Sequence, residues 1–358
     1  MNMAGEASSA GSPLPRAPRN RPRKVGKTKR RAPERKKNGV SAGAAVALNS
    51  CRLSYPSRLH MTTFPIRYVE PVYRPPSEAD SLILPVTNGC SWNRCTFCEM
   101  YSAPQKRFRP RDAQEVLESI KRCGEQFGPD LKRVFLADGD AMTLSTRRLV
   151  AVLEAIQRDL PGVRRVSSYC LPRNVRKKST AELKELKELG LSLVYVGAES
   201  GDDEVLARVD KGETFATTRE ALEKLQEAGV KRSVMILNGL GGTALSRQHA
   251  LNSAALMNAA QPEFLATLVV SFPYGDARLR GNFPDWEPLD VLGLMREMEL
   301  FISALELNRT VFRSDHASNW LVLRGTLGAD KPRLLQDLRR AIAEPDSAPL
   351  RPAWARGL

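Results

Sequence analysis

The stretch that decides the fold is LILPVTNGCSWNRCTFCEMY, residues 82–101, in which three cysteines fall within nine positions. Cys90, Cys95 and Cys98 directly follow a short apolar segment of the kind that forms a buried strand. Inert core cysteines do not suit this stretch, because charged and amide side chains are interleaved with the thiols. A loop at the end of a strand allows three thiolates to converge, so the stretch predicts a metal centre.

The number of ligands separates zinc from iron–sulfur. A structural zinc site needs four protein ligands, usually two Cys/His pairs. The second pair is missing, because the other candidates are scattered along the chain: His60, His249, His316, Cys51, Cys123 and Cys170. A four-iron cluster normally takes four thiolates, and three thiolates leave one iron free for an exogenous ligand. The ligand count therefore favours a reactive iron–sulfur cluster, whereas an electron-transfer cluster would need a fourth protein ligand.

The loop resembles the cluster-binding loop of the radical S-adenosylmethionine (SAM) superfamily, whose usual pattern is Cys-x3-Cys-x-aromatic-Cys. Phe97 supplies the aromatic residue, and the first spacer has four residues where three are usual. The resemblance implies that Cys90, Cys95 and Cys98 bind a [4Fe–4S] cluster and that SAM chelates its open iron. It also implies that Phe97 belongs to the cofactor site.

The resemblance further implies the type of reaction. Reductive cleavage of SAM would give a 5′-deoxyadenosyl radical that abstracts hydrogen from a substrate, with reduced flavodoxin or ferredoxin as electron donor. We therefore expect an oxidoreductase- or transferase-type radical SAM enzyme. The chain has no second cluster-binding cysteine set of the methylthiotransferase kind, and we expect the first sixty residues to be too irregular for a cobalamin domain. A small metabolite or cofactor is therefore the favoured substrate class, with a peptide as the alternative.

Strand-like and helix-like segments alternate along the chain. Strand patterns occur before Cys90 and at 132–137, 166–169, 191–196, 233–237 and 264–270. Helical spacing occurs between them, and capping boxes are expected at Ser179 to Glu182 and at Thr217 to Glu220. Such alternation indicates a parallel sheet with helices outside. The predicted fold class is α/β, a TIM-like partial (βα)6 barrel over residues 61–305.

Functional residues of such barrels lie where the strands end. Under the resemblance, Asp138, Gly139 and Asp140 follow the second strand and replace the superfamily's Gly-Gly-Glu motif, which binds the amino group of SAM. Lys211 is the candidate for the SAM carboxylate, and Arg173 is the competing candidate. These residues form the predicted methionine end of the SAM site.

Two further segments complete the predicted SAM site under the resemblance. Glu199 follows the fourth strand and matches a recurrent Glu in Gly-x-Glu-Ser-Gly that lies near the ribose or methionine end of SAM. Gly239 and Gly241 follow the fifth strand and resemble the adenine-side motif, where the lack of a Cβ lets the backbone approach the base.

Residues 306–358 are predicted to form a C-terminal α/β extension that caps the barrel, with a helix over 331–343. Asp315 and His316 lie there in a segment dense in hydrogen-bonding side chains and are the candidate catalytic residues. Substrate contact or proton transfer is the expected role, because histidine titrates near neutrality. The alternative is a histidine satisfied by a neighbouring hydroxyl or amide. His249, in a polar helical stretch, is expected to be solvated.

The net charge of +15 belongs mainly to the N-terminal segment, since residues 1–60 carry +12 of it. This segment is rich in Pro, Arg, Lys, Ala and Ser and lacks periodicity, so we expect it to be disordered. It is interpreted as an arm for nucleic acid or an acidic partner, as a targeting peptide, or as a misassigned start before Met61. It carries the alternative function, a metal-stabilised nucleic-acid-binding protein. No apolar run approaches the ~18 residues of a membrane span, so a cytoplasmic protein without a membrane partner is expected.

Overall fold

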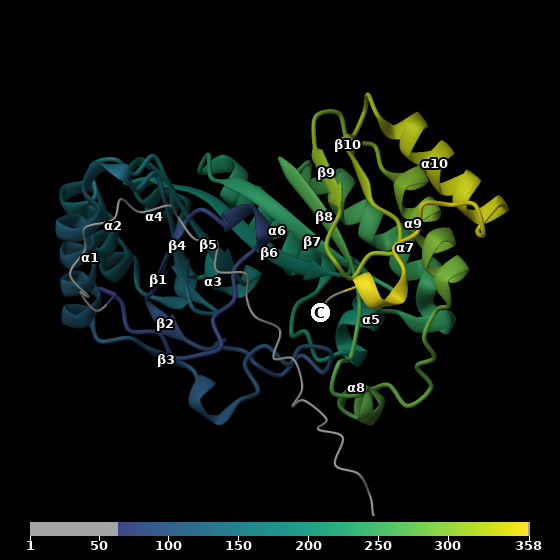
Figure 1. The fold of residues 1–358 in the computed structure, drawn as a ribbon, viewed down its shortest axis with the longest axis horizontal. Coiled ribbons are helices and arrows are strands. Elements are labelled where there is room, and N and C mark those ends of the chain that lie inside the picture. The colour runs from purple at the N-terminus through teal and green to yellow at the C-terminus, as the bar shows by residue number, and fades with distance from the viewer. Residues whose placement is uncertain (1–63, 357–358) are drawn as a thin grey trace, which may run out of the picture. The chain divides into compact units, whose positions relative to one another are not determined.

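A computed structural model describes residues 64–356, all within one compact unit of the chain (Figure 1). The predicted basic tail, residues 1–60, lies outside the described residues, and so do the interpretations attached to it. Within residues 64–356, no helix is both long enough and apolar enough to cross a membrane.

The centre of the fold is an eight-stranded sheet in the order β1-β4-β5-β6-β7-β8-β9-β10. The strands are β1 (Leu82–Pro85), β4 (Arg133–Ala137), β5 (Arg165–Cys170), β6 (Leu191–Glu199), β7 (Lys231–Asn238), β8 (Phe264–Val269), β9 (Val311–Ser314) and β10 (Leu323–Thr326). Neighbours from β1 to β9 pair in parallel, whereas β10 runs antiparallel to β9. The six predicted strands are confirmed, and two further strands extend the sheet.

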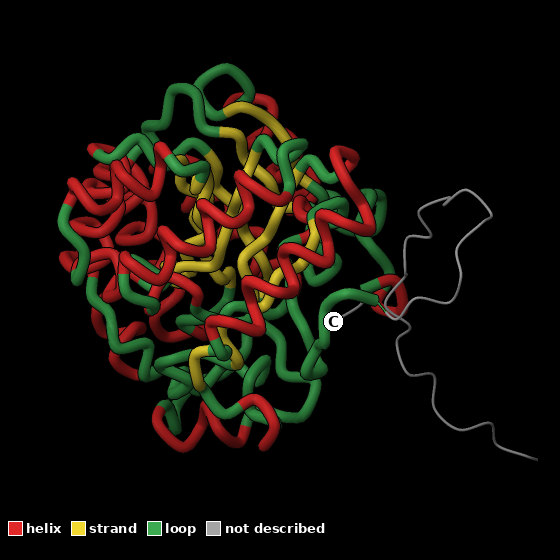
Figure 2. The backbone as a smooth tube through the Cα atoms, turned by 90° about the vertical axis from the view of Figure 1, so that its left-hand side faces the viewer, coloured by secondary structure: helices red, strands yellow, loops and turns green. Residues whose placement is uncertain are grey.

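The long helices form a series in which each contacts the next along the sheet. They are α1 (Ala113–Phe127), α2 (Thr146–Asp159), α4 (Thr180–Glu188), α6 (Phe215–Glu227), α7 (Gly242–Ala260), α9 (Val291–Ala304) and α10 (Lys331–Ala343). Figure 2 shows these helices outside the strands. Shorter helices α3 (Pro172–Arg176), α5 (Asp203–Arg208) and α8 (Ala277–Asn282) lie between them in sequence. The arrangement is the predicted TIM-like partial barrel.

Alternation along the strands separates the two faces of the sheet. On β7, Val234 and Ile236 are buried and belong to the main core together with residues of the long helices. Their neighbours Met235 and Leu237 are only partly buried. Because successive side chains of a strand point to opposite faces, the first pair faces the helices and the second faces the inside of the partial barrel.

The cysteine loop lies between two short strands, β2 (Thr87–Asn88) and β3 (Arg109–Pro110), which pair antiparallel. It follows β1, whose C-terminal end lies at the same sheet edge as the ends of the other parallel strands. The loops after β4, β5, β6 and β7 therefore meet the cysteine loop at one edge, as expected for this class of fold.

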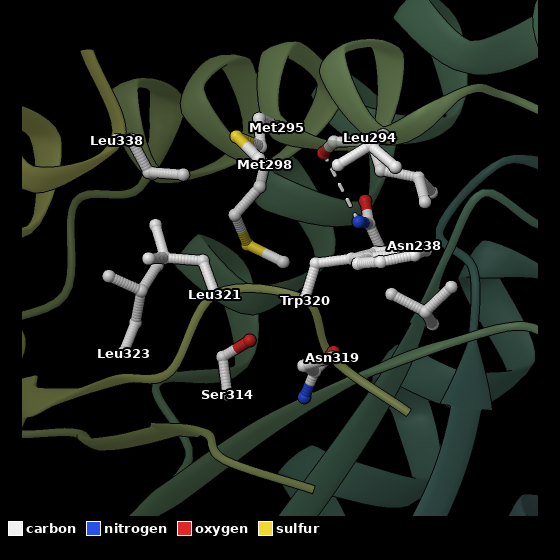
Figure 3. Close-up of a pocket in the computed structure, with 12 residues that line it drawn as sticks. Asn238, Leu294, Met295, Met298, Ser314, Asn319, Trp320, Leu321, Leu323 and Leu338 are labelled. Atoms are coloured by element: carbon white, nitrogen blue, oxygen red, sulfur yellow. Dashed lines mark hydrogen bonds between the residues drawn. The ribbon is translucent and has the colours of Figure 1, made fainter. Parts of the chain in front are cut away.

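The last strands and α10 complete the C-terminal side. The predicted helix over 331–343 is confirmed by α10 (Lys331–Ala343), which packs against α9. Figure 3 shows a small pocket between these helices and the sheet, where Met298, Leu321 and Leu338 meet and Asn238 Nδ2 donates to the Leu294 carbonyl at 3.2 Å. β9 and β10 continue the main sheet, and the division at residue 305 stays a prediction.

Local predictions about helix caps had mixed outcomes. The capping box of α4 is confirmed, with Ser179 and Glu182 bonded to each other's backbone N–H. The box predicted at Thr217 to Glu220 was wrong, because α6 begins at Phe215 and its box joins Thr214 to Thr217. The helical pattern alone did not reveal that a threonine three residues earlier was available as the cap.

The prediction that His249 is solvated was also wrong. His249 is 1% exposed on the buried side of α7, where its Nδ1 lies 2.8 Å from Ser200 Oγ and its Nε2 lies 3.0 Å from the Leu237 carbonyl oxygen. A carbonyl only accepts, so Nε2 carries the proton. The polar residues around His249 in the sequence hid the fact that small residues on the same helix face let α7 approach the sheet closely.

Candidate active site

The cysteine loop is fixed by the segment between α5 and α6. Thr96 donates its N–H to the Val209 carbonyl at 2.9 Å, and Trp92 Nε1 donates to the Asp210 carbonyl at 2.7 Å. Arg94 pairs with the Asp210 carboxylate at 3.0 Å. These two hydrogen bonds and one ion pair hold the loop against the C-terminal edge of the sheet.

A second clamp comes from α8, which is remote in sequence. Arg278 Nη1 donates to the Cys98 carbonyl at 2.7 Å. Within the loop, Asn93 adopts a positive φ of 47° and its Nδ2 donates to the Tyr101 carbonyl at 3.0 Å. Asparagine tolerates this left-handed conformation better than most residues, so Asn93 provides the turn that brings the thiols to one side.

The three thiols form one electrostatic group. Burial raises the pKa of Cys90, Cys95 and Cys98, to about 12 for Cys95. For each thiol the charge of Lys211 opposes this rise, and the charges of the other thiols raise the pKa of Cys95 further. The three thiols therefore share the influence of Lys211, and their role as cluster ligands stays a prediction.

The kind and number of the donors are consistent with an iron–sulfur cluster. Within the part of the chain that the structure describes, no three His, Cys, Asp or Glu side chains are grouped so as to hold one metal ion. Thiolates on one ion must lie within about two metal–sulfur bonds of about 2.3 Å of each other. In a four-iron cluster each thiolate binds a different iron, which allows wider spacing. By the chemistry of the donors, three thiols in one loop match the three protein ligands that leave one iron of a [4Fe–4S] cluster open.

Lys211 and Glu199 form a buried ion pair beside the thiols. Lys211 Nζ donates to Glu199 Oε1 at 3.1 Å, and both side chains are almost fully buried. Burial alone lowers the pKa of Lys211, but the charges of Glu199, Cys95 and Cys90 outweigh it and raise that pKa. Lys211 therefore stays cationic and places a positive charge against the cysteine loop.

Space for this pair comes from Gly197 on β6. A Cβ at Gly197 would lie closer than 3.0 Å to Glu199 Oε1 and 3.4 Å from Lys211 Nζ. Glu199 itself has a φ of 66°, which turns its side chain back over β6. Lys211 Nζ also lies 5.9 Å from the centre of the Phe97 ring, within the range of cation–π attraction. The structure thus brings together Phe97, Glu199 and Lys211, and their role in binding SAM stays a prediction.

Asp138 is paired with a lysine that sequence reasoning missed. Lys106, at the end of a short 3-10 helix (Pro104–Lys106), is fully buried; its ammonium forms an ion pair with Asp138 Oδ2 and donates to the Val69 carbonyl at 2.5 Å. Burial raises the pKa of Asp138 and Lys106 opposes the rise. Asp138 Oδ1 is buried and has no hydrogen-bond partner in the described chain. An acceptor without a donor is a candidate contact for an ammonium group.

Asp140 supports the cysteine loop directly. Its carboxylate accepts from the Ser91 hydroxyl and from Asn174 Nδ2, the latter at 2.6 Å. Burial raises the pKa of Asp140, while the bonds from Ser91 and Asn174 lower it. Both oxygens are therefore occupied by protein donors, and the side chain ties the second residue of the loop to α3.

Gly139 allows the two loops to touch. It has a φ of 88°, and a Cβ there would lie closer than 3.0 Å to the Gly89 carbonyl and to the Cys90 nitrogen. We predict that Gly139→Ala displaces the cysteine loop and lowers the iron bound after reconstitution at least severalfold. Gly229→Ala is the matched control, because Gly229 has a φ of 74° with nothing within 4 Å of its Cβ position.

Both alanines meet the same backbone penalty of about 1 kcal/mol for a left-handed residue. Thermal unfolding and iron content, measured on both variants, separate backbone strain from displacement of the loop. Equal iron content in the two variants would show that the contact of Gly139 with Gly89 does not matter for the cluster.

Arg173, the competing candidate for the SAM carboxylate, is engaged with protein. Its Nε donates to Glu213 Oε1 at 2.8 Å, its Nη2 donates to the Gly212 carbonyl, and its guanidinium lies 3.8 Å from the centre of the Trp92 ring. A Cβ at Gly212 would collide with both Trp92 and Arg173. Arg173 therefore supports the cysteine loop through its contact with Trp92. Lys211 is among the charges that lower the pKa of the three thiols against the effect of burial.

Gly239 and Gly241 lie at the end of β7. Gly239 has a φ of 86°, its N–H donates to Glu297 Oε1 at 2.6 Å, and a Cβ would lie 2.8 Å from Leu294. A cavity of about 340 Å³ adjoins Gly239 and is lined by the two tryptophans Trp286 and Trp320. Burial raises the pKa of Glu297, a buried carboxyl that sequence reasoning missed because nothing local marks it.

Asp315 and His316 follow β9 at the same sheet edge. Asp315 Oδ2 accepts from Arg324 Nε at 2.7 Å and lies 3.6 Å from Arg313 Nη1. His316 Nδ1 accepts the Ser318 N–H at 3.1 Å and lies 2.9 Å from Ser318 Oγ. This neighbouring hydroxyl is the contact that the alternative interpretation expects; the catalytic role stays a prediction.

One protein-family model matches the central part of this chain. The model described as Radical SAM superfamily matches residues 84–253. The heme chaperone HemW of Bacillus subtilis is 26% identical over 172 residues, 46% of this chain and 45% of that protein. The hopanoid C-3 methylase of Methylococcus capsulatus is 23% identical over 151 residues, 42% of this chain and 27% of that protein. The chain therefore spans less than half the length of these relatives.

Two solved structures are similar to parts of this chain. Coproporphyrinogen III oxidase (HemN) from Escherichia coli gives a TM-score of 0.48 at 15% identity, covering 62% of this chain and 52% of that one. The methyltransferase TsrM from Kitasatospora setae gives 0.43 at 20% identity, covering 52% and 36%.

Proposed function

Since this chain belongs to the radical SAM superfamily, whose family model matches residues 84–253, we propose that Cys90, Cys95 and Cys98 hold a [4Fe–4S] cluster and that the chain binds SAM at the open iron. The proposed substrate is a small metabolite or cofactor, with a peptide as the alternative. The proposed electron donor is reduced flavodoxin or ferredoxin in the cytoplasm.

One observation carries the proposal: a single loop at the C-terminal edge of a parallel sheet holds three thiols, and the charge of the buried Lys211 acts on each of them. Lys211 lowers the pKa of every one of the thiols and so favours the thiolate form that iron requires. Cys123 and Cys170 are buried away from this group, in the helix-facing core.

The C-terminal edge of the sheet offers side chains that could bind the ammonium and carboxylate groups of SAM. The unpaired Asp138 Oδ1 would accept from the SAM ammonium, and Lys211 would attract its carboxylate. Phe97, Gly239 and Gly241 would contact the nucleoside, because they offer an aromatic ring and backbone without intervening side chains. When bound, the cluster and SAM supply reductive cleavage of the sulfonium and a carbon radical able to abstract hydrogen.

The chain's own contribution is to position these groups and to exclude water. Asp140 and Asn174 fix Ser91, and Arg278 fixes Cys98, so the loop is rigid on both sides of the thiols. The charges of the Lys211–Glu199 pair are buried away from solvent. Salt screens a buried pair much less than an exposed one.

The proposal is tested by anaerobic reconstitution with iron and sulfide, followed by dithionite and SAM. We expect about four irons per chain, a change in the EPR spectrum of the reduced cluster on addition of SAM, and formation of 5′-deoxyadenosine. The triple variant Cys90→Ala/Cys95→Ala/Cys98→Ala should show none of these. An intact cluster whose EPR spectrum ignores SAM would contradict an open iron.

We also propose that His316 contacts the substrate as a neutral hydrogen-bond donor. Burial lowers the pKa of His316 below its ordinary value of 6.5, and Arg351 lowers it further, while Asp315 opposes the shift. Its Nδ1 accepts the Ser318 N–H, so at neutral pH the proton resides on Nε2.

The predicted titration of His316 is directly measurable. In NMR spectra of histidine-labelled protein, assigned with His316→Gln, we expect a midpoint below 6.5, rising in Arg351→Gln and falling further in Asp315→Asn. A midpoint at or above 6.5 in the parent would refute a neutral imidazole held by burial.

A further inference from the structure

The inner face of the sheet carries a continuous row of residues that leads away from the thiols. The strand registers pair Gly197 with Met235, Met235 with Ala266, Ala266 with Arg313, and Arg313 with Arg324. The row therefore crosses β6, β7, β8, β9 and β10. With strands about 4.8 Å apart, Gly197 and Arg313 are separated by about 14 Å.

This row faces the inside of the partial barrel. The residues on either side of it along each strand, such as Ile236, Leu265 and Phe312, are buried in the helix-facing core. Side chains alternate between the two faces of a strand, so Met235 and Ala266 point away from the helices. Both are only partly buried, which means that no element of the described chain covers them fully.

The row begins at the predicted SAM site. Glu199 Oε1 lies directly above Gly197, and Lys211 is bound to Glu199. The next inward-facing residues, Leu237 and Leu268, also pair in register and are partly buried. Leu237 belongs to the same apolar cluster as Phe97. An apolar surface therefore extends from the cysteine loop across β7 and β8.

The row ends in positive charge. Arg313 and Arg324 have side chains that are 54% and 60% exposed, and both pair with the single carboxylate of Asp315. Two guanidinium groups on one carboxylate leave a net charge of +1. In the part of the chain that the structure describes, their remaining N–H groups bond to no acceptor. Arginine recognises carboxylate and phosphate groups through free N–H donors of this kind.

We infer that the substrate has an apolar body that lies along Met235, Ala266, Leu237 and Leu268, and an anionic group, carboxylate or phosphate, that Arg313 and Arg324 bind. The inference rests on the proposed function, because it assigns the inner face of the barrel to the substrate. It deepens that function by naming the substrate class. The spacing of the row places the anionic group about 14 Å from the Glu199–Lys211 pair.

The test uses the full-length protein under anaerobic conditions and a neutral fluorescent reporter, N-phenylnaphthylamine. The reporter becomes fluorescent in apolar surroundings and carries no charge for the arginines to bind. Decanoate, decyl phosphate and decanol then compete with it. We expect at least one of the two anions to displace the reporter at a concentration roughly tenfold lower than decanol does, because a charge-assisted pair with arginine contributes about one decade of affinity.

Variants assign the two ends of the site. In Arg313→Gln/Arg324→Gln the advantage of the anions over decanol should disappear while reporter binding stays unchanged. Arg339→Gln is the matched control, since Arg339 is 62% exposed on α10 and pairs with Glu299. Ala266→Phe fills the middle of the row and should weaken reporter binding at least severalfold. Circular dichroism and thermal unfolding of each variant check that the fold is retained.

The outcomes are distinguishable from those of the proposed function. No preference for either anion in the parent, a preference that survives in the arginine variant, or unchanged reporter binding in Ala266→Phe would each overturn the inference. The relative strength of decanoate and decyl phosphate identifies the anionic group. A protein that binds these anions through Arg313 and Arg324 yet takes up no cluster would refute the proposed function alone.

Discussion

Cys95→Ala should abolish the proposed [4Fe–4S] cluster, and we expect the broad visible absorption and the bound iron to fall to background after anaerobic reconstitution. The reason is that the loop offers three thiols, while the other cysteines of residues 64–356, Cys123 and Cys170, are buried in the helix-facing core. Two thiolates cannot hold three irons of a cluster against loss to solvent. Cys90→Ala and Cys98→Ala should behave in the same way.

Cys123→Ala and Cys170→Ala are the matched controls. Both thiols are buried in the helix-facing core, where Cys123 lies on the buried stripe of α1 with Val116 and Ile120. Their removal should cost stability of about 1–2 kcal/mol through lost packing and should leave the iron content unchanged. Loss of the cluster in either control would identify that cysteine as a fourth protein ligand and would contradict an open iron.

Lys106→Met should lower the free energy of unfolding of the protein by about 3–5 kcal/mol, because it leaves Asp138 buried without its partner. The two side chains are 0% and 2% exposed, and Lys106 also binds the Val69 carbonyl. Burial already raises the pKa of Asp138 and Lys106 opposes that rise, so the variant should shift that pKa further upward. Guanidinium unfolding followed by circular dichroism measures the loss.

An exposed ion pair provides the comparison. Arg339 on α10 binds Glu299 at 2.7 Å with a side chain that is 62% exposed, so Arg339→Gln should change the stability by less than about 1 kcal/mol. The loss in Lys106→Met should also shrink as the pH falls, because protonation of Asp138 removes the uncompensated charge. A pH-independent loss would mean that packing of the lysine stem, and not its charge, is what matters.

The sequence predicted those parts of the site that are local. The apolar run before Cys90, the spacing of the three thiols and the turn residues after β4, β6 and β7 are all neighbours along the chain. Hydrophobic periodicity likewise located six parallel strands, because each strand is flanked by turn-forming residues. The assignment of Glu199 and Lys211 to the SAM site came from the resemblance, which did not predict that the two side chains form an ion pair.

The contacts that the sequence did not reveal are long-range. Lys106 reaches Asp138 over 32 positions and Arg278 reaches Cys98 over 180 positions. Neither residue belongs to a pattern, since a single lysine or arginine in a loop is usually solvated. The wrong prediction for His249 has the same cause. Its burial depends on the close approach of α7 to the loop after β6, where Ser253 Oγ accepts the Gly201 N–H at 2.9 Å.

The contact of Arg278 with the cysteine loop sets an order of assembly. During synthesis the three cysteines leave the ribosome long before Arg278, and before the 209–210 segment that holds Thr96 and Trp92. Until then the nascent loop lacks these contacts, and its thiols are more exposed to oxidation and to stray metal ions. We therefore expect iron and sulfide to be loaded late, by maturation factors that recognise the completed domain and not the emerging chain.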